Sequence, residues 1–282
     1  MSYFKDIKSP YLIAEIGINH NGDLQIAKKL IDAAFACGWN CAKFQKKSPE
    51  LCVPESQKNI LKQTPWGEMT YLEYKKKIEL DRPEYGYIDR YCREKPIDWT
   101  ASVWDLDSLD FINSFDVKFL KIPSAKLTDY ELLTAAAQTG KPIMLSTGMS
   151  TIDEIDVAVS MLSIHASDFM LMHCNSSYPT KKEELNLMAI KTLRERYGCE
   201  VGFSGHEYGL ESTTYAAVLG AKVIERHITI SHELWGSDQA SSIEPHGMDM
   251  LCKRIRDIDK MMGDGKKIVY DSELEFRKKL RR

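Results

Sequence analysis

Short apolar runs alternate with helical patterns along this chain, and this alternation constrains the fold more than any other feature of the sequence. Strand-length runs occupy residues 11–18, 41–45, 98–103, 119–122, 143–146, 169–174, 201–203 and 223–227. Helical spacing follows most of these runs, around Leu109 and Phe111 and at 24–37, 129–139, 152–164, 187–197, 210–219 and 246–262. Eight strand–helix units predict a (β/α)8 TIM barrel, with 1–282 as a single domain.

One segment departs from this rhythm. We expect an insertion at about 46–87, which contains the sequence Thr-Pro-Trp-Gly at 64–67 and a helical piece over 71–78. Insertions in barrel loops on the catalytic side often form lids or substrate walls. A doubly wound open sheet shows the same alternation, but it usually carries a glycine-rich turn after its first strand. Residues 19–23 read Asn-His-Asn-Gly-Asp, which is no dinucleotide fingerprint, and this favours the barrel.

Composition excludes several classes of partner. The 282 residues carry a formal net charge of -3, which provides no basic face for a nucleic acid backbone. No apolar run is long enough to cross a bilayer, and residues 1–9 show no signal-peptide pattern. The seven cysteines are odd in number and form no CxxC pair, which argues against a disulfide framework or a structural zinc site. We therefore expect a cytoplasmic protein with neither a nucleic acid nor a membrane as partner.

Polar residues end nearly every predicted strand, where the active site of a TIM barrel is built. They are Glu15, Lys43, Gln45, Ser102, Lys121, Ser124, Ser146, Asn175, Tyr178, Ser204, His206 and His227. Lysines beside hydroxyl and amide groups suit a small, highly charged anion that carries a phosphate and a carboxylate. Either lysine alone could be a snorkelling residue at a strand end. Two lysines inside apolar strands favour an anion site, because an unpaired charge there is costly.

Several of these residues keep more than one interpretation. His206 and His227 end neighbouring strands and could share a divalent metal with water and substrate. They could also be satisfied core histidines or acid–base groups, and their spacing alone does not decide. Glu15 could be a buried partner of Lys43, or it could face a substrate hydroxyl or a reacting water. Asp238 lies in a Gly-Ser-Asp sequence that is common in ordinary turns.

The strand-end motifs read AEIGINHNGD at 14–23, KFQ at 43–45, KIPS at 121–124, LSTGM at 145–149, HCNSSYP at 173–179 and ERH at 225–227. In these motifs and their order, the sequence resembles the sialic acid (N-acetylneuraminate) synthases and their relatives for legionaminic and pseudaminic acids. The resemblance implies a TIM-barrel transferase that condenses phosphoenolpyruvate with a sugar aldehyde. Its products would be phosphate and a nonulosonic, sialic-acid-like 2-keto-3-deoxy sugar acid.

The resemblance also implies roles for individual residues. Phosphoenolpyruvate would be held by Lys43, Ser102, Lys121, Ser124, Ser146, Asn175 and Ser204. His206 and His227 would bind Mn2+ or Mg2+, which would polarise the sugar aldehyde while C3 of phosphoenolpyruvate attacks it. Glu15 would manage a proton at the reacting centre. Tyr178 and Asp238 would contact the sugar, and we expect Gln45, within the KFQ motif, to contact substrate as well.

Three features depart from the family pattern on the acceptor side. Residues 236–239 read Gly-Ser-Asp-Gln where the family usually has Gly-Pro-Asp-His, and residues 204–207 read Ser-Gly-His-Glu where it has Ser-Asp-His. We also expect a short form that lacks the C-terminal antifreeze-like domain of many members, unless a separate protein supplies it. The acceptor is therefore expected to be an amino or deoxy sugar related to N-acetylmannosamine. Because the family tends to dimerise, a homodimer is the expected assembly.

Two alternatives compete with this interpretation. An enzyme that forms an octulosonate or heptulosonate from a phosphorylated aldose would need a further cationic cluster for the second phosphate. Lys46 and Lys47 could supply it, although a charge pair on a loop is usually only solvated. A catalytically silent barrel that binds a sugar or a partner protein is the other alternative. The retained lysines and histidines speak against it, since an inactive site has no need of them.

Overall fold

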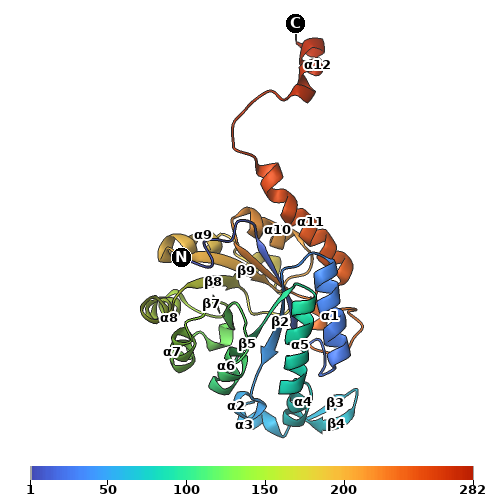
Figure 1. Ribbon diagram of the computed structural model, residues 1–282, viewed down its shortest axis with the longest axis vertical. Coiled ribbons are helices and arrows are strands. Elements are labelled where there is room, and N and C mark those ends of the chain that lie inside the picture. Colours follow the sequence, from blue (N-terminus) through green and yellow to red (C-terminus); the bar gives the residue numbers. More distant parts are fainter. Residues whose placement is uncertain (1, 282) are drawn as a thin grey trace.

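The computed structural model describes residues 2–281 and shows a closed barrel of parallel strands surrounded by helices (Figure 1). Around the barrel the strands follow the order β1-β10-β9-β8-β7-β6-β5-β2, and β2 pairs with β1 to close it. Their bounds are β1 (Tyr11–Gly17), β2 (Cys41–Lys46), β5 (Asp98–Val103), β6 (Leu120–Ile122), β7 (Ile143–Ser146), β8 (Phe169–Cys174), β9 (Glu200–Gly205) and β10 (Val223–His227). The predicted (β/α)8 fold is confirmed.

Helices that follow each of the barrel strands form the outer ring. They are α1 (Leu24–Ala36), α5 (Arg82–Glu94), α6 (Leu106–Asn113), α7 (Tyr130–Gln138), α8 (Ile152–His165), α9 (Ala189–Tyr197), α10 (Glu211–Val218) and α11 (Pro245–Met262). Local sequence fixes where several begin. Asp23 accepts hydrogen bonds from the first turn of α1, and Thr151 forms a capping box with Glu154 at the start of α8. Such caps satisfy amide groups that the helix itself leaves without partners.

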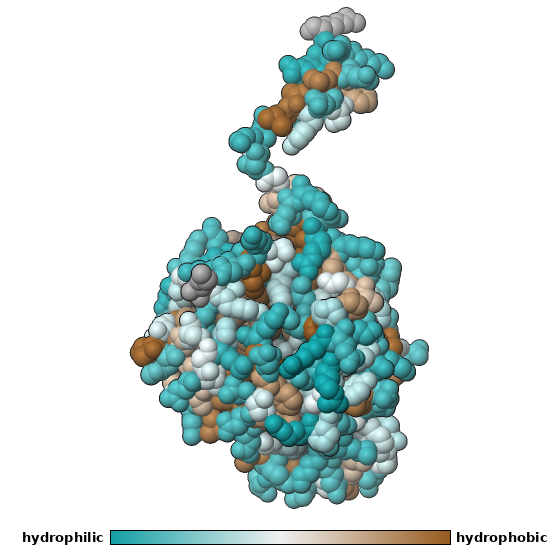
Figure 2. All heavy atoms as spheres, in the orientation of Figure 1, coloured by the Kyte–Doolittle hydropathy of each residue, from teal (hydrophilic) through white to brown (hydrophobic). Residues whose placement is uncertain are grey.

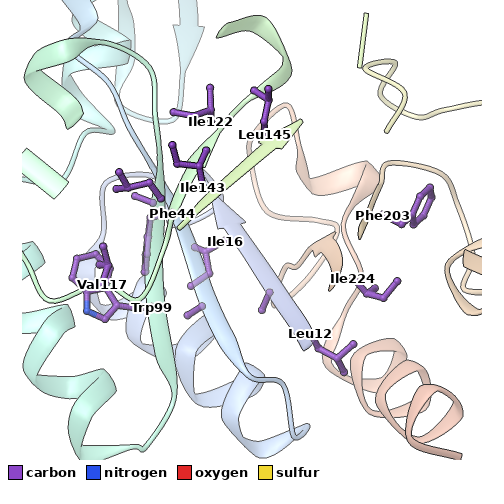
Figure 3. Close-up of a cluster of buried hydrophobic side chains, with 14 of the residues drawn as sticks. Leu12, Ile16, Phe44, Trp99, Val117, Ile122, Ile143, Leu145, Phe203 and Ile224 are labelled. Atoms are coloured by element: carbon purple, nitrogen blue, oxygen red, sulfur yellow. The ribbon is translucent and has the colours of Figure 1, made fainter. Parts of the chain in front are cut away.

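The larger part of the core lies between the strands and the helices. Leu12, Ile16, Phe44, Leu145 and Ile224 belong to it, and Figure 3 shows these side chains on several strands of the barrel. Because the helices cover the outside of the barrel and side chains fill its inside, the strands are buried on both faces. The first parts of strands such as β1 and β8 therefore read as continuous apolar runs rather than as an alternating pattern.

A second, smaller core closes the inside of the barrel at the N-terminal ends of the strands. It contains Phe4, Ile13, Cys41, Phe119, Met144, Met170, Met172 and Val223. Phe4, from the segment before β1, is fully buried there. This apolar floor blocks one end of the barrel, so a ligand can enter only at the other.

Side chains two residues further along these strands face the same interior, because strand residues alternate between faces. At this level the apolar floor gives way to polar groups. Glu15 follows Ile13, Lys43 follows Cys41, Lys121 follows Phe119, Ser146 follows Met144, and Glu225 follows Val223. Register aligns them, since Glu15 pairs with Lys43 and Ser102 with Lys121. The fold thus gathers polar side chains from distant parts of the sequence above one floor.

The chain between β2 and α5 forms a compact appendage at the lower end of the barrel in Figure 1. It consists of α2 (Pro49–Cys52), α3 (Glu55–Lys58), the hairpin of β3 (Leu61–Thr64) and β4 (Gly67–Thr70), and α4 (Tyr71–Lys77). Tyr74 and Ile78 bury themselves against Ile18, just after β1. The appendage is thereby tied to the end of the barrel that carries the polar groups. Residues 82–87 of the expected insertion belong to α5, a helix that the sequence reasoning did not predict.

The C-terminal segment leaves the barrel after α11. It ends in α12 (Asp271–Leu280), which projects away from the body in Figure 1, and Figure 2 shows exposed apolar side chains along it. All seven cysteines are free thiols, as expected from their number and spacing. Within residues 2–281, no helix combines the length and the apolar character needed to span a membrane.

Candidate active site

A cavity of about 150 Å3 opens at the C-terminal ends of the strands. Most of the predicted site residues line it, from all eight barrel strands or the segments that follow them. They are Glu15, Lys43, Gln45, Ser102, Lys121, Ser124, Ser146, Tyr178, Ser204, His206 and His227. Trp104, Cys174 and Glu225 also contribute to its wall. The size suits a small molecule, and most of the residues that line the cavity carry polar side chains.

Two lysines and two carboxylates form the deepest part of the wall. The Lys43 ammonium lies 2.6 Å from Oε2 of Glu15 and 3.5 Å from Oε1 of Glu225. The Lys121 ammonium lies 3.8 Å from the same Glu225 oxygen. All four side chains are almost completely buried. Glu225 therefore lies between the two ammonium groups and is a shared counter-ion for both.

Hydroxyl groups complete the partners of this cluster. The Lys43 ammonium donates to the hydroxyl of Ser102 at 2.8 Å, and the Lys121 ammonium donates to that of Ser146 at 2.7 Å. The Ser204 hydroxyl donates to Glu225 at 3.0 Å. Each lysine can still offer further N–H groups, because an ammonium carries three donors.

The pKa values of the two carboxyl groups are shifted in opposite directions. Desolvation raises the pKa of Glu15 to about 7, although Lys43 opposes the shift. Burial would also raise the pKa of Glu225, but the neighbouring Lys121 and Lys43 outweigh it and hold this pKa at about 2. Burial lowers the pKa of Lys121, and Glu225 opposes that shift. Near neutral pH, Glu225 is therefore ionised, and Glu15 is the carboxyl group that can take up a proton when an anion enters.

A second group of donors lies beside Lys121. The Ser124 hydroxyl accepts a hydrogen bond from the backbone N–H of Gly148 at 3.0 Å and lies 3.2 Å from the sulfur of Cys174. A side chain at position 148 would not fit, because its Cβ would lie 2.4 Å from the Ser176 hydroxyl and 2.9 Å from that of Ser124. Glycine thus allows three strand ends to approach closely around one edge of the cavity.

The two histidines face each other across the cavity, with ring centroids 5.5 Å apart. Nδ1 of His206 lies 2.7 Å from the backbone oxygen of Asn175. Since a carbonyl only accepts, Nδ1 carries the proton, and Nε2 can accept from the Tyr178 hydroxyl at 2.8 Å. Burial, followed by the proximity of His227, lowers the pKa of His206 to about 4. Burial also lowers the pKa of His227, so both rings are neutral near pH 7.

These histidines fit a divalent metal in part. Neutral imidazoles are the form that binds metal, and a backbone carbonyl that fixes the ring of a ligand is typical of such sites. Nδ1 of His227 is buried without a hydrogen-bond partner among the described residues, 3.9 Å from Oδ2 of Asp238. Within residues 2–281, no group of three or more His, Cys, Asp or Glu side chains gathers as a ligand set. Water and substrate would have to complete the coordination.

A buried ion pair lies directly behind the histidines. Glu207 directly follows His206, and Arg226 directly precedes His227. Their side chains therefore point to the outside of the barrel. They pair at 3.2 Å with almost no exposure. Arg226 also donates to the backbone oxygens of Glu207 and Gly209 at 2.6 and 3.0 Å. The pair ties the loop after β9 to β10 and so fixes the spacing of His206 and His227.

Two of the expected site residues do not line the cavity. The Asn175 carboxamide bonds to the backbone of Ser177 and Glu184, and only its backbone oxygen takes part, through His206. Asp238 stands at the rim near His227. Their contacts with substrate stay predictions. Glu225 is the important residue that sequence reasoning did not select. The signal was its position two residues before His227, which places both on the inner face of one strand.

Comparisons with known proteins agree with this geometry. The NeuB family model matches residues 30–267. An N,N'-diacetyllegionaminic acid synthase from Campylobacter jejuni is 36% identical over 272 residues, which cover 95% of this chain and 81% of that protein. The N-acetylneuraminate-9-phosphate synthase of Drosophila melanogaster is 37% identical, covering 89% of this chain and 68% of that protein. The solved N-acetylneuraminic acid synthetase of Leptospira borgpetersenii, a citrate complex, has a TM-score of 0.85 at 33% identity and covers 98% of this chain and 94% of that one.

Proposed function

This chain belongs to the NeuB family, and from that premise we propose that it condenses phosphoenolpyruvate with the open-chain aldehyde of an amino or deoxy sugar. The products are a nonulosonic 2-keto-3-deoxy sugar acid and phosphate. The named relatives are synthases of this kind of sugar acid. The octulosonate and heptulosonate alternative is accordingly not favoured.

One observation carries the proposal: Lys43 and Lys121 lie around one carboxylate in one small cavity. Phosphoenolpyruvate carries a phosphate and a carboxylate on a three-carbon skeleton, and it needs cations and oriented donors at short range. The two ammonium groups supply charge, and Ser102, Ser124 and Ser146 supply hydroxyls. A silent barrel would gain nothing from two buried lysines, since the desolvation of buried charges is costly even when carboxylates such as Glu15 and Glu225 pair with them.

The reaction forms one carbon–carbon bond, and at C2 a bond to the oxygen of water replaces the bond to the phosphate oxygen. C3 of phosphoenolpyruvate attacks the aldehyde carbon, whose oxygen gains a proton. Water adds to the cationic C2, loses a proton, and the tetrahedral intermediate expels phosphate. Lys43 and Lys121 hold the anion in position for attack. This positioning lowers the entropic part of the activation free energy. Glu15, with a pKa raised to about 7 by burial, is poised to exchange a proton near neutral pH.

His206 and His227 are the residues that would hold a divalent ion, Mn2+ or Mg2+. Bound there, the ion would supply Lewis-acid polarisation of the sugar aldehyde. The chain's own contribution is to keep both imidazoles neutral by burial and to orient His206 through Asn175. Tyr178, whose ring lies against that of His206 with centroids 4.0 Å apart, would face the sugar.

The test is a panel of hexosamines and deoxyhexosamines supplied with phosphoenolpyruvate and Mn2+. At least one sugar should give a 2-keto-3-deoxy acid together with an equal amount of phosphate. Lys121→Ala should abolish turnover while circular dichroism shows an intact fold. Full activity in this variant, or no consumption of phosphoenolpyruvate with any sugar, would refute the proposal.

A further inference from the structure

The loop between β10 and α11, residues 228–244, follows His227 at the mouth of the barrel. Its two ends are joined, because the backbone N–H of Thr229 donates to the oxygen of Ile243 at 3.0 Å and that of Ile243 donates to the oxygen of His227 at 2.8 Å. Between these ends the loop contains the short 3-10 helix η3 (Gln239–Ser241). A loop of this kind makes few backbone–backbone hydrogen bonds, so side chains must fix its course.

Gln239 lies at the centre of this loop, and its side chain is almost completely buried. Its carboxamide oxygen accepts a hydrogen bond from the hydroxyl of Thr229 at 2.5 Å. Its Nε2 donates to the backbone oxygens of Trp235 at 3.3 Å and Asn19 at 3.4 Å. One side chain thereby ties together the start of the loop, its outer arch and the segment after β1. The two carbonyl oxygens need donors and the hydroxyl needs an acceptor, and an amide is a neutral group that supplies both.

Asp238 directly precedes Gln239, so these contacts also fix its place. Its backbone oxygen accepts from the hydroxyl of Ser242 and its carboxylate from that of Ser237, both at 2.7 Å. Its Oδ2 lies 3.9 Å from Nδ1 of His227, a buried nitrogen without a hydrogen-bond partner among the described residues. A carboxylate beside the second nitrogen of a metal-binding histidine fixes the orientation and tautomer of the ring. Nε2 is then the nitrogen left for a ligand in the cavity.

The outer arch of the loop is held independently, by the segment after β1 and by the appendage. The carboxamide of Asn21 donates to the backbone oxygen of Trp235 at 2.7 Å. The Trp235 ring meets those of Tyr74 and Trp66 edge to face, with centroids 5.1 and 5.9 Å apart. These contacts do not involve the side chain of Gln239, so a substitution there leaves the loop attached to the protein. What it loosens is the inner side of the loop, which faces the histidines.

We propose that Gln239 is a positioning residue for the acceptor half of the reaction, because its carboxamide holds Asp238 beside His227. The inference rests on the proposed function, which assigns His227 to the metal and Asp238 to the sugar. Gln239 is not among the described residues that line the active-site cavity, so it acts through these two neighbours. Lys43 and Lys121 come from other strands and have their own partners in Ser102 and Ser146. Binding of phosphoenolpyruvate should therefore not depend on Gln239.

The experiment compares the wild type with Gln239→Met, which keeps the length of the side chain and removes its hydrogen bonds, and with Thr229→Val, which removes one of them. In Gln239→Met, kcat/KM for the sugar that supports turnover in the panel above should fall by roughly ten-fold or more, the usual effect of losing a residue that orients a metal ligand. The Kd for Mn2+, followed by electron paramagnetic resonance without any sugar, should rise by a similar factor. Thr229→Val should change both quantities in the same direction and by less.

The Kd for phosphoenolpyruvate, measured by calorimetry, should stay at the wild-type value in both variants, and this also shows that they fold. Tyr197→Phe is the matched control, since it loses a hydrogen bond to Asp156 between the outer helices α9 and α8. It should behave as wild type in all three measurements.

An unchanged kcat/KM for the sugar, or an unchanged affinity for Mn2+, in a folded Gln239→Met protein would overturn the inference. An equal loss of phosphoenolpyruvate binding would also overturn it, because the damage would then be general. Should Gln239→Met not fold, Thr229→Val carries the same test with the smaller change. The proposed function fails on a different result, namely no consumption of phosphoenolpyruvate by the wild type with any sugar. The Mn2+ measurement needs no sugar and decides the inference in that case as well.

Discussion

Substituting Glu225 by glutamine removes the negative charge that two buried lysines share. The carboxylate oxygen lies 3.5 Å from the Lys43 ammonium and 3.8 Å from that of Lys121. At an effective dielectric constant of about 20, each of these attractions is worth roughly 4–5 kcal/mol. Glutamine is cheaper to bury than a carboxylate, which offsets part of the loss. Lys43 keeps Glu15 at 2.6 Å, so the uncompensated charge falls on Lys121.

We therefore expect Glu225→Gln to lower the free energy of unfolding by about 3 kcal/mol, the lower end of the cost of breaking a buried pair. Urea denaturation at pH 7 and low salt measures it. Inorganic phosphate should stabilise the variant more than the wild type, because an anion that binds only the folded state replaces the missing charge. An unchanged free energy of unfolding, or the same response to phosphate in both proteins, would refute the electrostatic account of the cluster.

Two other buried groups give further predictions. Glu207→Gln should destabilise the fold by about 3–5 kcal/mol in urea, since it leaves Arg226 without its charged partner. It should also weaken Mn2+ binding, followed by electron paramagnetic resonance; unaltered Mn2+ affinity would contradict the role of this pair in spacing the histidines. Burial raises the folded-state pKa of Glu15 from 4.5 to about 7, so the folded state holds this proton more tightly than the unfolded state. Wild-type stability should accordingly fall as the pH rises from about 4.5 to 7, and Glu15→Gln should lack this decline in urea titrations across the range; parallel curves would be inconsistent with the shift.

The barrel strands could be predicted because they are buried on both faces. The runs at 98–103, 143–146, 169–174 and 223–227 coincide with β5, β7, β8 and β10. The run at 201–203 is shorter than β9 (Glu200–Gly205), because Ser204 and Gly205 end the apolar run while the strand continues. Pairing with both neighbours, rather than side-chain hydrophobicity, extends the strand there.

Helix α5 shows where the apolar pattern fails. Its sequence is polar, and Gly86 interrupts it with a residue of low helix propensity. The signal that could have identified it lies at its start, where Asp81 and Glu84 form a capping box around Pro83. The hairpin of β3 and β4 was missed for a different reason. Its strands are mostly exposed, so no buried face imposes alternation on the sequence.

Most of the candidate site could be predicted because the C-terminal ends of all the parallel strands meet at the same end of the barrel. The side chain of Asn175 does not line the cavity. This residue follows the last residue of β8, where strand alternation no longer fixes the direction of a side chain. Glu225 was not selected either, although it lies on the same predicted strand as His227, in the ERH motif at 225–227. The structure gives the reason for that carboxylate: two buried lysines need a counter-charge before any substrate arrives.

The central claim is that Lys43 and Lys121, in the deepest part of the active-site cavity, form the phosphoenolpyruvate site. Calorimetric titration of phosphoenolpyruvate into the wild-type protein, Lys121→Met and the surface control Lys76→Met tests it without requiring the acceptor. The Kd should rise roughly ten-fold or more in Lys121→Met, because one charge-assisted contact is lost, and stay at the wild-type value in Lys76→Met. An unchanged Kd in a folded Lys121→Met protein would place the phosphoenolpyruvate site elsewhere and contradict the account.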